Sequence, residues 1–405
     1  MTAGTVIIGA GQAGLSAAEA LRKRGYEGPV TLIGVEFAPP YQRPPLSKGY
    51  LSGELPAERL WLKPEAYFDA ARIHLRTGVH VTRIDRGAKC VITGEGEAIA
   101  YDHLILATGG AARRLALPGA ELPGVHVLRS LAQADALSDA MAGAKRLAII
   151  GAGYIGLEVA ASARKRGLEV SVLEAADRPM ARTASPLLGG WFGALHRGYG
   201  VDLQVSTGVA AITGAARADG VRLADGERIE ADLVLIAAGL VAGTQLAEEA
   251  GLACADGILV DAHARTSDRD IFAIGDVARF ESGLYGRSIR LESVQNAIEQ
   301  GRAAAAAICG APAVYDPVPW FWSDQYAMKL QIAGLIDGAD QMVRRGDPEE
   351  GAFALFHLKD GVLIACEAVN AAPEFMAAQR LIAARARPDP DALRDVTVAM
   401  RAFLS

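Results

Sequence analysis

"VIIGAGQAG" at residues 6–14 returns, slightly changed, as "AIIGAGYIG" at residues 148–156. In each copy a β-branched apolar segment leads through G-x-G-x-x-G into a helix-like segment that ends in a basic run and a glycine. The first glycine permits a tight turn, the second lets backbone approach a pyrophosphate, and the third lets helix and strand pack closely. Amides at the helix N-terminus then bind the phosphates. One copy is a weak signal, but two copies in a strand–helix–strand context predict an α/β chain with two dinucleotide sites.

Acidic residues complete both predicted sites. Glu174 closes the strand after the second motif, where a carboxylate accepts hydrogen bonds from ribose hydroxyls and repels a 2′-phosphate. NADH is therefore favoured over NADPH, although Arg178 and Arg182 nearby leave NADPH open. In the first copy Glu36 is the candidate acid.

The composition excludes several classes of protein. The 405 residues are 51% hydrophobic, and the net charge of −6 gives no reason to expect nucleic acid or an anionic membrane as partner. The longest apolar run, residues 233–243, is too short to span a membrane, and the first motif begins too early for a signal peptide, so we expect a cytoplasmic protein. The cysteines form no C-x-x-C or similar pair, which predicts neither a metal site nor a dithiol. They are Cys90, Cys254, Cys309 and Cys366, each expected to be a small buried apolar residue.

The order of the motifs predicts nested domains. A further strand, within residues 266–279, ends at Gly275-Asp276, and Asp276 is either a ligand of a ribityl chain or an ordinary N-cap. We expect a first dinucleotide-binding domain over residues 1–112 and 247–318, a second over 113–246, and a C-terminal α+β domain over 319–405. The last should contain an Asp360-Gly361 hairpin and helices around 373–386 and 389–403.

Six segments resemble one known family, the FAD-dependent NADH:ferredoxin reductases of bacterial oxygenase systems, represented by putidaredoxin reductase and the dioxygenase ferredoxin reductases. They are "RPPLSK" 43–48, "LATGG" 106–110, "GAGYIGLE" 151–158, "AIGDVARF" 273–280, "ESVQNA" 292–297 and "PWFWSDQY" 319–326. The resemblance covers essentially the whole chain. It implies a glutathione-reductase-like flavoprotein with two dinucleotide-binding domains and a C-terminal α+β domain.

The resemblance also implies roles for single residues. Relatives commonly carry an acid where this chain has Val35, so the FAD ribose contact falls to Glu36 or to the backbone at Val35. The other implied FAD contacts are Gly9, Gly11, Ala13, Gly14, Arg43, Lys48, Val81, Thr108, Gly109, Arg129, Asp276, Val294 and Trp322. The implied NADH contacts are Gly151, Gly153, Ile155, Gly156, Glu158 and Glu174.

Flavin would connect a two-electron donor with a one-electron acceptor. NADH delivers a hydride, whereas a 2Fe–2S ferredoxin takes one electron at a time, and flavin can do both. We hypothesise that Lys48 and Glu158 pair beside flavin N5, where Lys48 stabilises charge on the reduced ring and Glu158 orients the nicotinamide. The alternatives are a solvated surface lysine at position 48 and a helix-terminal acid, satisfied by the helix dipole, at position 158.

The implied partner is an acidic 2Fe–2S ferredoxin that supplies a cytochrome P-450 type monooxygenase or a ring-hydroxylating dioxygenase. Its predicted docking residues are Lys63, Arg302, Lys329 and Arg380. The protein itself would be a monomer or a dimer. Alternatives are an NADH:rubredoxin or oxygen/peroxide reductase and an NADH-sensing flavoprotein that acts by binding. A flavin disulfide reductase is disfavoured, because no cysteine precedes Cys90.

Overall fold

The computed structural model describes residues 3–404, which gather into two compact units. The first contains the chain up to Gln42 with Glu58–Ala111 and Val241–Pro319, and the second contains Arg43–Ala57, Ala112–Leu240 and Trp320–Ser405. Two of the points at which the chain passes from one unit to the other lie within short strands, β8 (Gly110–Ala112) and β17 (Leu240–Ala242). The division into three domains at the expected boundaries stays a prediction.

A parallel sheet of order β19-β7-β1-β2-β3 forms the centre of the first unit. Its strands are β1 (Thr5–Ile8), β2 (Val30–Ile33), β3 (His74–Arg76), β7 (His103–Leu106) and β19 (Ile271–Ala273). The last of these lies far along the chain from the others, yet it pairs directly with β7. The sheet that contains β1 is therefore completed by a strand that comes more than 160 residues after its neighbour β7 in the sequence.

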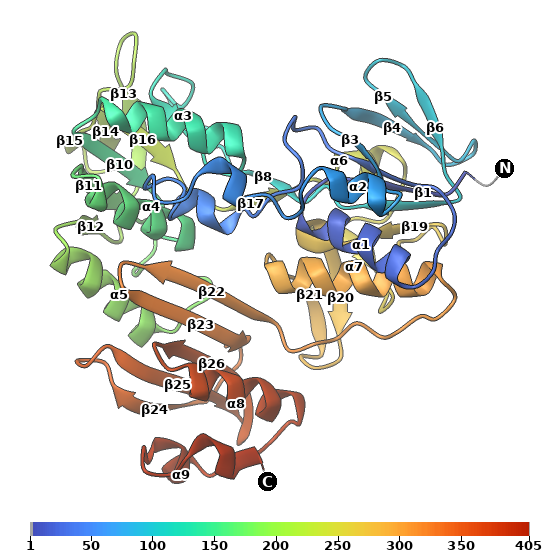
Figure 1. Ribbon diagram of the computed structural model, residues 1–405. Helices are drawn as coiled ribbons and strands as arrows, with labels where there is room; N and C mark the ends of the chain where they lie inside the picture. Colours follow the sequence, from blue (N-terminus) through green and yellow to red (C-terminus); the bar gives the residue numbers. More distant parts are fainter. Residues whose placement is uncertain (1–2, 405) are drawn as a thin grey trace. The chain divides into compact units, whose positions relative to one another are not determined.

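Alternate residues of β1 decide what covers each face of this sheet. Ile7 packs with α1 (Gln12–Lys23) and α7 (Val294–Ile308), which lie side by side in blue and orange in Figure 1. Val6 and Ile8 join the core on the opposite face. The remaining elements of the unit are β4 (Val81–Asp85), β5 (Cys90–Thr93), β6 (Ala98–Ala100), β18 (Ile258–Val260), β20 (Ala278–Ser282), β21 (Arg287–Arg290), α2 (Ala66–Ala70) and α6 (Gln245–Glu249).

A second parallel sheet, of order β12-β11-β10-β16-β9, follows the second glycine motif. Its strands are β9 (Val125–His126), β10 (Arg146–Ile150), β11 (Glu169–Leu173), β12 (Asp202–Gln204) and β16 (Leu233–Ile236). Around it lie α3 (Leu131–Ala142), α4 (Tyr154–Lys165), α5 (Pro186–Gly198) and the small sheet β13 (Val209–Thr213), β14 (Gly220–Leu223) and β15 (Arg228–Glu230). The two parallel sheets confirm the predicted α/β class.

The end of the chain forms an antiparallel sheet with α8 packed on it (Figure 1). Its strands are β22 (Trp320–Gln325), β23 (Met328–Gly334), β24 (Gln341–Asp347), β25 (Ala352–Lys359) and β26 (Val362–Val369). The predicted Asp360-Gly361 turn joins β25 to β26, and both residues have positive φ. The predicted C-terminal mixture of strands and helices is confirmed.

One of the two predicted C-terminal helices is wrong in length. α8 spans Ala372–Ala383, close to expectation, but the expected helix over 389–403 is only α9 (Pro390–Arg394), followed later by a 3-10 helix, Met400–Leu404. The buried guanidinium of Arg345 explains the interruption, because it donates hydrogen bonds to the carbonyls of Leu393, Asp395, Val396 and Val398. Four carbonyls that converge on one guanidinium cannot all point along a helix axis, as those of a continuous helix do.

The expectation for the cysteines is only partly correct. Cys366 is fully buried, whereas Cys90, Cys254 and Cys309 are partly exposed, and all four are free thiols. Within residues 3–404 no group of three or more His, Cys, Asp or Glu side chains could hold a metal ion. No helix in that range is long and apolar enough to cross a membrane.

Candidate functional site

The loop between β1 and α1 has room for a pyrophosphate only because three of its residues are glycine. Gly9 has φ of 114°, and a Cβ there would lie 2.0 Å from the Ala107 carbonyl oxygen. A Cβ on Gly14 would lie 2.0 Å from the Gly9 oxygen, so helix and strand could not pack. At Gly11 a Cβ would meet no described atom within 4 Å. The crowded and open positions therefore match those expected of a dinucleotide cradle.

The second glycine loop repeats this geometry in the second unit. Gly151 has φ of 107°, a Cβ on Gly156 would lie 2.2 Å from the Gly151 oxygen, and Gly153 again faces open space. Gly11 and Gly153 are the N-caps of α1 and α4 and have no side chain to bind the first helical amides. Those amides are the groups that bind phosphate at a helix N-terminus. Both loops therefore fit the diphosphate of a dinucleotide.

Glu174 lies beside the second loop, as predicted. Its carboxylate accepts hydrogen bonds from the backbone amides of Ala152, at 2.7 Å, and Ala176, at 2.9 Å. An ionised carboxylate offers about four acceptor positions, so two remain for ribose hydroxyls. Arg178, one of the two arginines that left NADPH open, donates to Asp177 at 2.9 Å and to the carbonyl of Ala181.

Glu36, the acidic residue predicted for the first dinucleotide site, is also held in place. Glu36 accepts a hydrogen bond from the hydroxyl of Tyr41 at 2.7 Å, while the Val35 side chain is 63% exposed. An apolar side chain offers no hydrogen bond to a ribose, so Val35 could contribute only through its backbone. The ribose contact at Glu36 or Val35 stays a prediction.

The other positions predicted to contact FAD are divided between the units. In the first unit Thr108 donates to the Gly243 carbonyl at 2.8 Å, Asp276 lies in a 3-10 turn, and Val294 begins α7. Gly9, Gly11, Ala13, Gly14, Val35, Glu36, Val81 and Gly109 belong to the same unit, whereas Arg43, Lys48, Arg129 and Trp322 belong to the second. Their contacts with FAD stay predictions.

A buried amide beside Gly275 was missed in the sequence. Gln300 on α7 is fully buried; its Oε1 accepts from the Gly275 amide at 2.7 Å, while its Nε2 lacks a partner among the described residues. A buried donor without a partner is costly unless a water or a ligand satisfies it. Its position by Gly275, whose Cβ would lie 2.9 Å from that of Ala13, suits a bound group at the first glycine loop.

Glu158 is the centre of a buried polar cluster in the second unit. Lys48 Nζ lies 3.0 Å from Glu158 Oε1, which also accepts from the Ser323 hydroxyl at 2.6 Å. The Ser47 hydroxyl donates to Oε2 at 2.5 Å. Glu158 is 5% exposed. The predicted pairing of Lys48 with Glu158 is present, and side chains rather than helix amides satisfy the carboxylate.

The proline-rich segment that carries Lys48 is fixed on α4. Pro44 and Pro45 begin a 3-10 helix, Pro44–Ser47, whose restricted φ values suit this tight turn. The Ser162 hydroxyl donates to the Ser47 carbonyl at 2.8 Å, one helical turn beyond Glu158. Lys48 is therefore a held, mostly buried side chain rather than a solvated surface lysine.

β22 contributes a second wall of the same cluster. Its side chains alternate, so residues 321, 323 and 325 share one face. On that face Phe321 packs on Tyr154 with ring centroids 4.5 Å apart, Ser323 binds Glu158, and Gln325 binds His196 at 2.9 Å. The sequence marked "PWFWSDQY" as specific, but only the pairing of strands shows which residues face α4 and α5.

The predicted docking residues occur in both units. Lys63 forms an ion pair with Glu19 at 2.8 Å and lies over the Tyr67 ring, and Arg302 is exposed on α7 of the same unit. Lys329 on β23 and Arg380 on α8 are exposed in the second unit. Docking at these residues stays a prediction.

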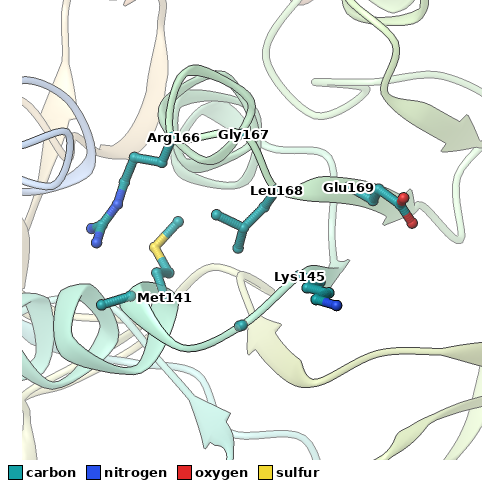
Figure 2. A pocket seen from close by; sticks show the side chains of 8 residues that line it. Met141, Lys145, Arg166, Gly167, Leu168 and Glu169 are labelled. Atoms are coloured by element: carbon teal, nitrogen blue, oxygen red, sulfur yellow. The ribbon is translucent and has the colours of Figure 1, made fainter.

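A pocket of about 370 Å³ lies where β10 and β11 begin, which is the opposite end of the second parallel sheet from the glycine loop. Figure 2 shows its lining residues. The pocket is lined by the ends of α3 and α4 and the start of β11, including Met141, Lys145, Arg166 and Glu169. Arg166 is bound to Ser138 and to the Leu51 carbonyl. Since α/β folds bind nucleotides at the carboxyl ends of the strands, this pocket is not part of the dinucleotide site.

Two family profiles match the chain, one over its first three-quarters and one over its C-terminal part. The profile of pyridine nucleotide-disulphide oxidoreductases matches residues 4–301, and a profile described as reductase C-terminal matches residues 320–404. The chain belongs to the pyridine nucleotide-disulphide oxidoreductase family. Among solved structures of this family, the ferredoxin reductase for the CYP199A2 system from Rhodopseudomonas palustris is 41% identical, with a TM-score of 0.97 over 99% of this chain and 100% of that one. The covalent putidaredoxin reductase–putidaredoxin complex gives 38% identity and a TM-score of 0.96, covering 99% and 98%.

Curated relatives within the family are similar over more than nine-tenths of their length. Rhodocoxin reductase of Rhodococcus erythropolis is 48% identical over 391 residues, 96% of this chain and 92% of the relative. Putidaredoxin reductase CamA of Pseudomonas putida is 39% identical, covering 99% of this chain and 96% of the relative. The resemblance stated from the sequence and the predicted glutathione-reductase-like fold class with a C-terminal domain are both confirmed.

Proposed function

We propose that the protein is an NADH-dependent ferredoxin reductase, which passes electrons from NADH through bound FAD to a 2Fe–2S ferredoxin serving a monooxygenase or a ring-hydroxylating dioxygenase. The observation that carries this function is the pair of dinucleotide cradles in a chain similar, end to end, to ferredoxin reductases. Ferredoxin reductase components of benzene and anthranilate dioxygenase systems are similar over 98% of this chain. The predicted enzyme class and its cofactors, FAD and NAD(H), agree with this family.

The two cradles would divide the cofactors between them. The loop Gly9–Gly14, with Glu36 and Asp276, would hold FAD, and the loop Gly151–Gly156, with Glu174, would hold NADH. Bound flavin supplies the chemistry that accepts a hydride and passes electrons on singly. The protein itself has to bind the two cofactors, orient them, and neutralise the charge that accompanies hydride transfer.

The Glu158 cluster supports a role in orienting the nicotinamide. Oε1 already accepts from Lys48 and Ser323, whereas among residues 3–404 Oε2 accepts only from Ser47. A carboxylate oxygen accepts about two hydrogen bonds, so Oε2 keeps one position for the carboxamide N–H. Lys48 balances the charge of this buried carboxylate and, in our proposal, the negative charge that accompanies hydride transfer. No side chain has to change protonation for that step.

The distribution of cysteines supports an external electron acceptor. The first cysteine of the chain is Cys90, and all four thiols are free. An internal dithiol relay needs two cysteines close together beside the flavin. Electrons would instead leave to a separate carrier, for which we propose an acidic ferredoxin that docks on Lys63, Arg302, Lys329 and Arg380. We propose a cytoplasmic location for this exchange.

Turnover with and without a 2Fe–2S ferredoxin tests the function. NADH-dependent cytochrome c reduction should depend strongly on added ferredoxin, because cytochrome c takes its electron from the reduced carrier. Equal rates with and without ferredoxin would contradict the proposal. They would favour the rubredoxin or oxygen reductase, or the NADH sensor, that the sequence left open.

A further inference from the structure

A series of hydrogen bonds leads from Glu158 through the interior of the second unit. The Ser323 hydroxyl lies 2.6 Å from Glu158 Oε1, and Gln325 Nε2 lies 3.1 Å from the Ser323 oxygen. Gln325 Oε1 lies 2.9 Å from His196 Nε2, and the Tyr326 hydroxyl lies 3.2 Å from His196 Nδ1. These four residues come from β22, its following turn and α5, far along the sequence from Glu158.

The carboxylate at one end fixes the direction of every bond. An ionised carboxylate only accepts, so Ser323 must donate its single proton to Glu158. Ser323 can then only accept from Gln325, which directs the amide nitrogen toward Ser323 and the amide oxygen toward His196. His196 must therefore carry its proton on Nε2, and its Nδ1 accepts from Tyr326. All donors point toward Glu158.

The series is buried over most of its length. Ser323 and His196 are fully buried and Gln325 is 1% exposed. Burial lowers the pKa of His196, consistent with the neutral ring that this direction of bonding requires. Tyr326, at the outer end, stacks on the partly exposed ring of Tyr199 with centroids 3.7 Å apart. Burying so many polar groups stabilises the fold less than apolar packing would. A buried polar network is tolerated only when each of its donors and acceptors is hydrogen-bonded.

We propose that Gln325, His196 and Tyr326 are positioning residues, which act through Ser323 to hold the Glu158 carboxylate in one orientation for the nicotinamide carboxamide. This rests on the proposed function only in requiring that NADH reduces the bound flavin. A carboxylate held by Lys48 and Ser47 alone would keep its charge but could rotate away from the geometry that hydride transfer needs. The C-terminal domain would thus complete the nicotinamide site through one face of β22.

A double-mutant cycle tests whether these residues act through Glu158. Gln325→Leu should slow flavin reduction by NADH about tenfold, the loss expected for a broken chain of buried hydrogen bonds. In a Glu158→Gln background the same substitution should cause no further slowing, because the group it positions is already changed. Equal slowing in both backgrounds would overturn the proposal in favour of a purely structural role.

Two measurements keep the proposal testable if Gln325→Leu fails to fold. His196→Gln retains an N–H donor near the Nε2 position and should reduce flavin at nearly the wild-type rate, whereas His196→Leu should be about tenfold slower. In the wild-type holoprotein, ¹⁵N NMR of labelled histidine should show His196 as a neutral ring protonated on Nε2. An Nδ1-protonated or cationic ring at neutral pH would overturn the proposal.

The assay separates this inference from the proposed function. It follows only the reduction of flavin by NADH and contains no ferredoxin. If NADH fails to reduce the wild-type protein, both proposals fall. If the wild type is reduced but the cycle is additive, only the positioning role falls.

Discussion

Glu158 is a buried charge whose partners come from two separate parts of the chain. A buried carboxylate is tolerated only when it is paired and most of its acceptor positions are filled, and Lys48, Ser47 and Ser323 fill three of about four. The sequence led us to the two charged members, because they occur in family segments. Serines carry no periodic or charge signal, so Ser47 and Ser323 became visible only once the chain was folded.

Removing the charge of Glu158 should slow hydride transfer. In Glu158→Gln the side chain keeps its shape but loses its charge and its pairing with Lys48, and flavin reduction should fall on the order of 100-fold through lost orientation. Lys48→Met should also slow it. Stopped-flow reduction by NADH measures both. The control Glu169→Gln changes an exposed glutamate at the start of β11, and wild-type rates in all three variants would disprove the role.

His196 should make the protein less stable in mild acid. Burial lowers its pKa below the usual 6.5, so the unfolded chain binds a proton that the folded protein excludes. The free energy of unfolding should therefore fall as pH decreases below 6.5 and level off only below the lower, folded-state pKa. Urea unfolding across this range should show a shallower dependence in His196→Gln. An unchanged dependence would mean that His103 and His126, whose pKa values are also lowered by burial, account for all of it.

At the scale of elements, β22 and the C-terminal tail show why sequence patterns were insufficient. The alternation within "WFWSDQ" predicts a strand but cannot say which face meets α4, because both faces contain aromatic residues. The tail has helix-like spacing over 389–403, yet the structure has a short α9 and a non-helical segment around Asp395. One arginine, Arg345 on β24, decides this by binding carbonyls that lie about fifty positions later.

Arg345 should therefore be important for stability. Its side chain is 6% exposed, pairs with Glu374 at 3.1 Å and binds four backbone carbonyls of the tail. Arg345→Met would remove this donor from the Glu374 carboxylate and from those carbonyls, at a cost of about 3 kcal/mol. Urea unfolding measures this loss. Arg344→Met, on the exposed side of the same strand, is the matched control and should change the free energy of unfolding by less than about 0.5 kcal/mol.

For the whole molecule, the two glycine motifs were enough to predict the α/β class, because each motif fixes a strand, a turn and a helix locally. The order of the motifs predicted that the chain returns to its first domain near residue 247. The bounds of that domain stay a prediction, and β19 pairs with β7. The sequence assigned Arg43–Ala57 to the first domain, and the predicted pairing of Lys48 with Glu158 was its one expected link to the second unit. Its other contacts include hydrogen bonds to α3 and α4, such as those of Tyr50 with Asp135 and of Ser162 with Ser47, which no local pattern reveals.

Ferredoxin docking depends on charges at the protein surface. The effect of charges at a docking patch can be distinguished from the effect of the protein's net charge. Reversing Lys329 and Arg380 together to glutamate should lower ferredoxin-dependent turnover about tenfold at low ionic strength and weaken its salt dependence, because paired charges at an interface mainly steer association. Reversing Arg222 and Arg269, also exposed, changes the net charge equally and should have little effect. Ferricyanide needs no protein docking, so its reduction should stay unchanged in both variants. If ferricyanide reduction falls as much as ferredoxin turnover, the defect lies in the flavin site. If both pairs of reversals lower ferredoxin turnover alike, the protein's overall charge attracts the partner, and no docking patch exists at Lys329 and Arg380.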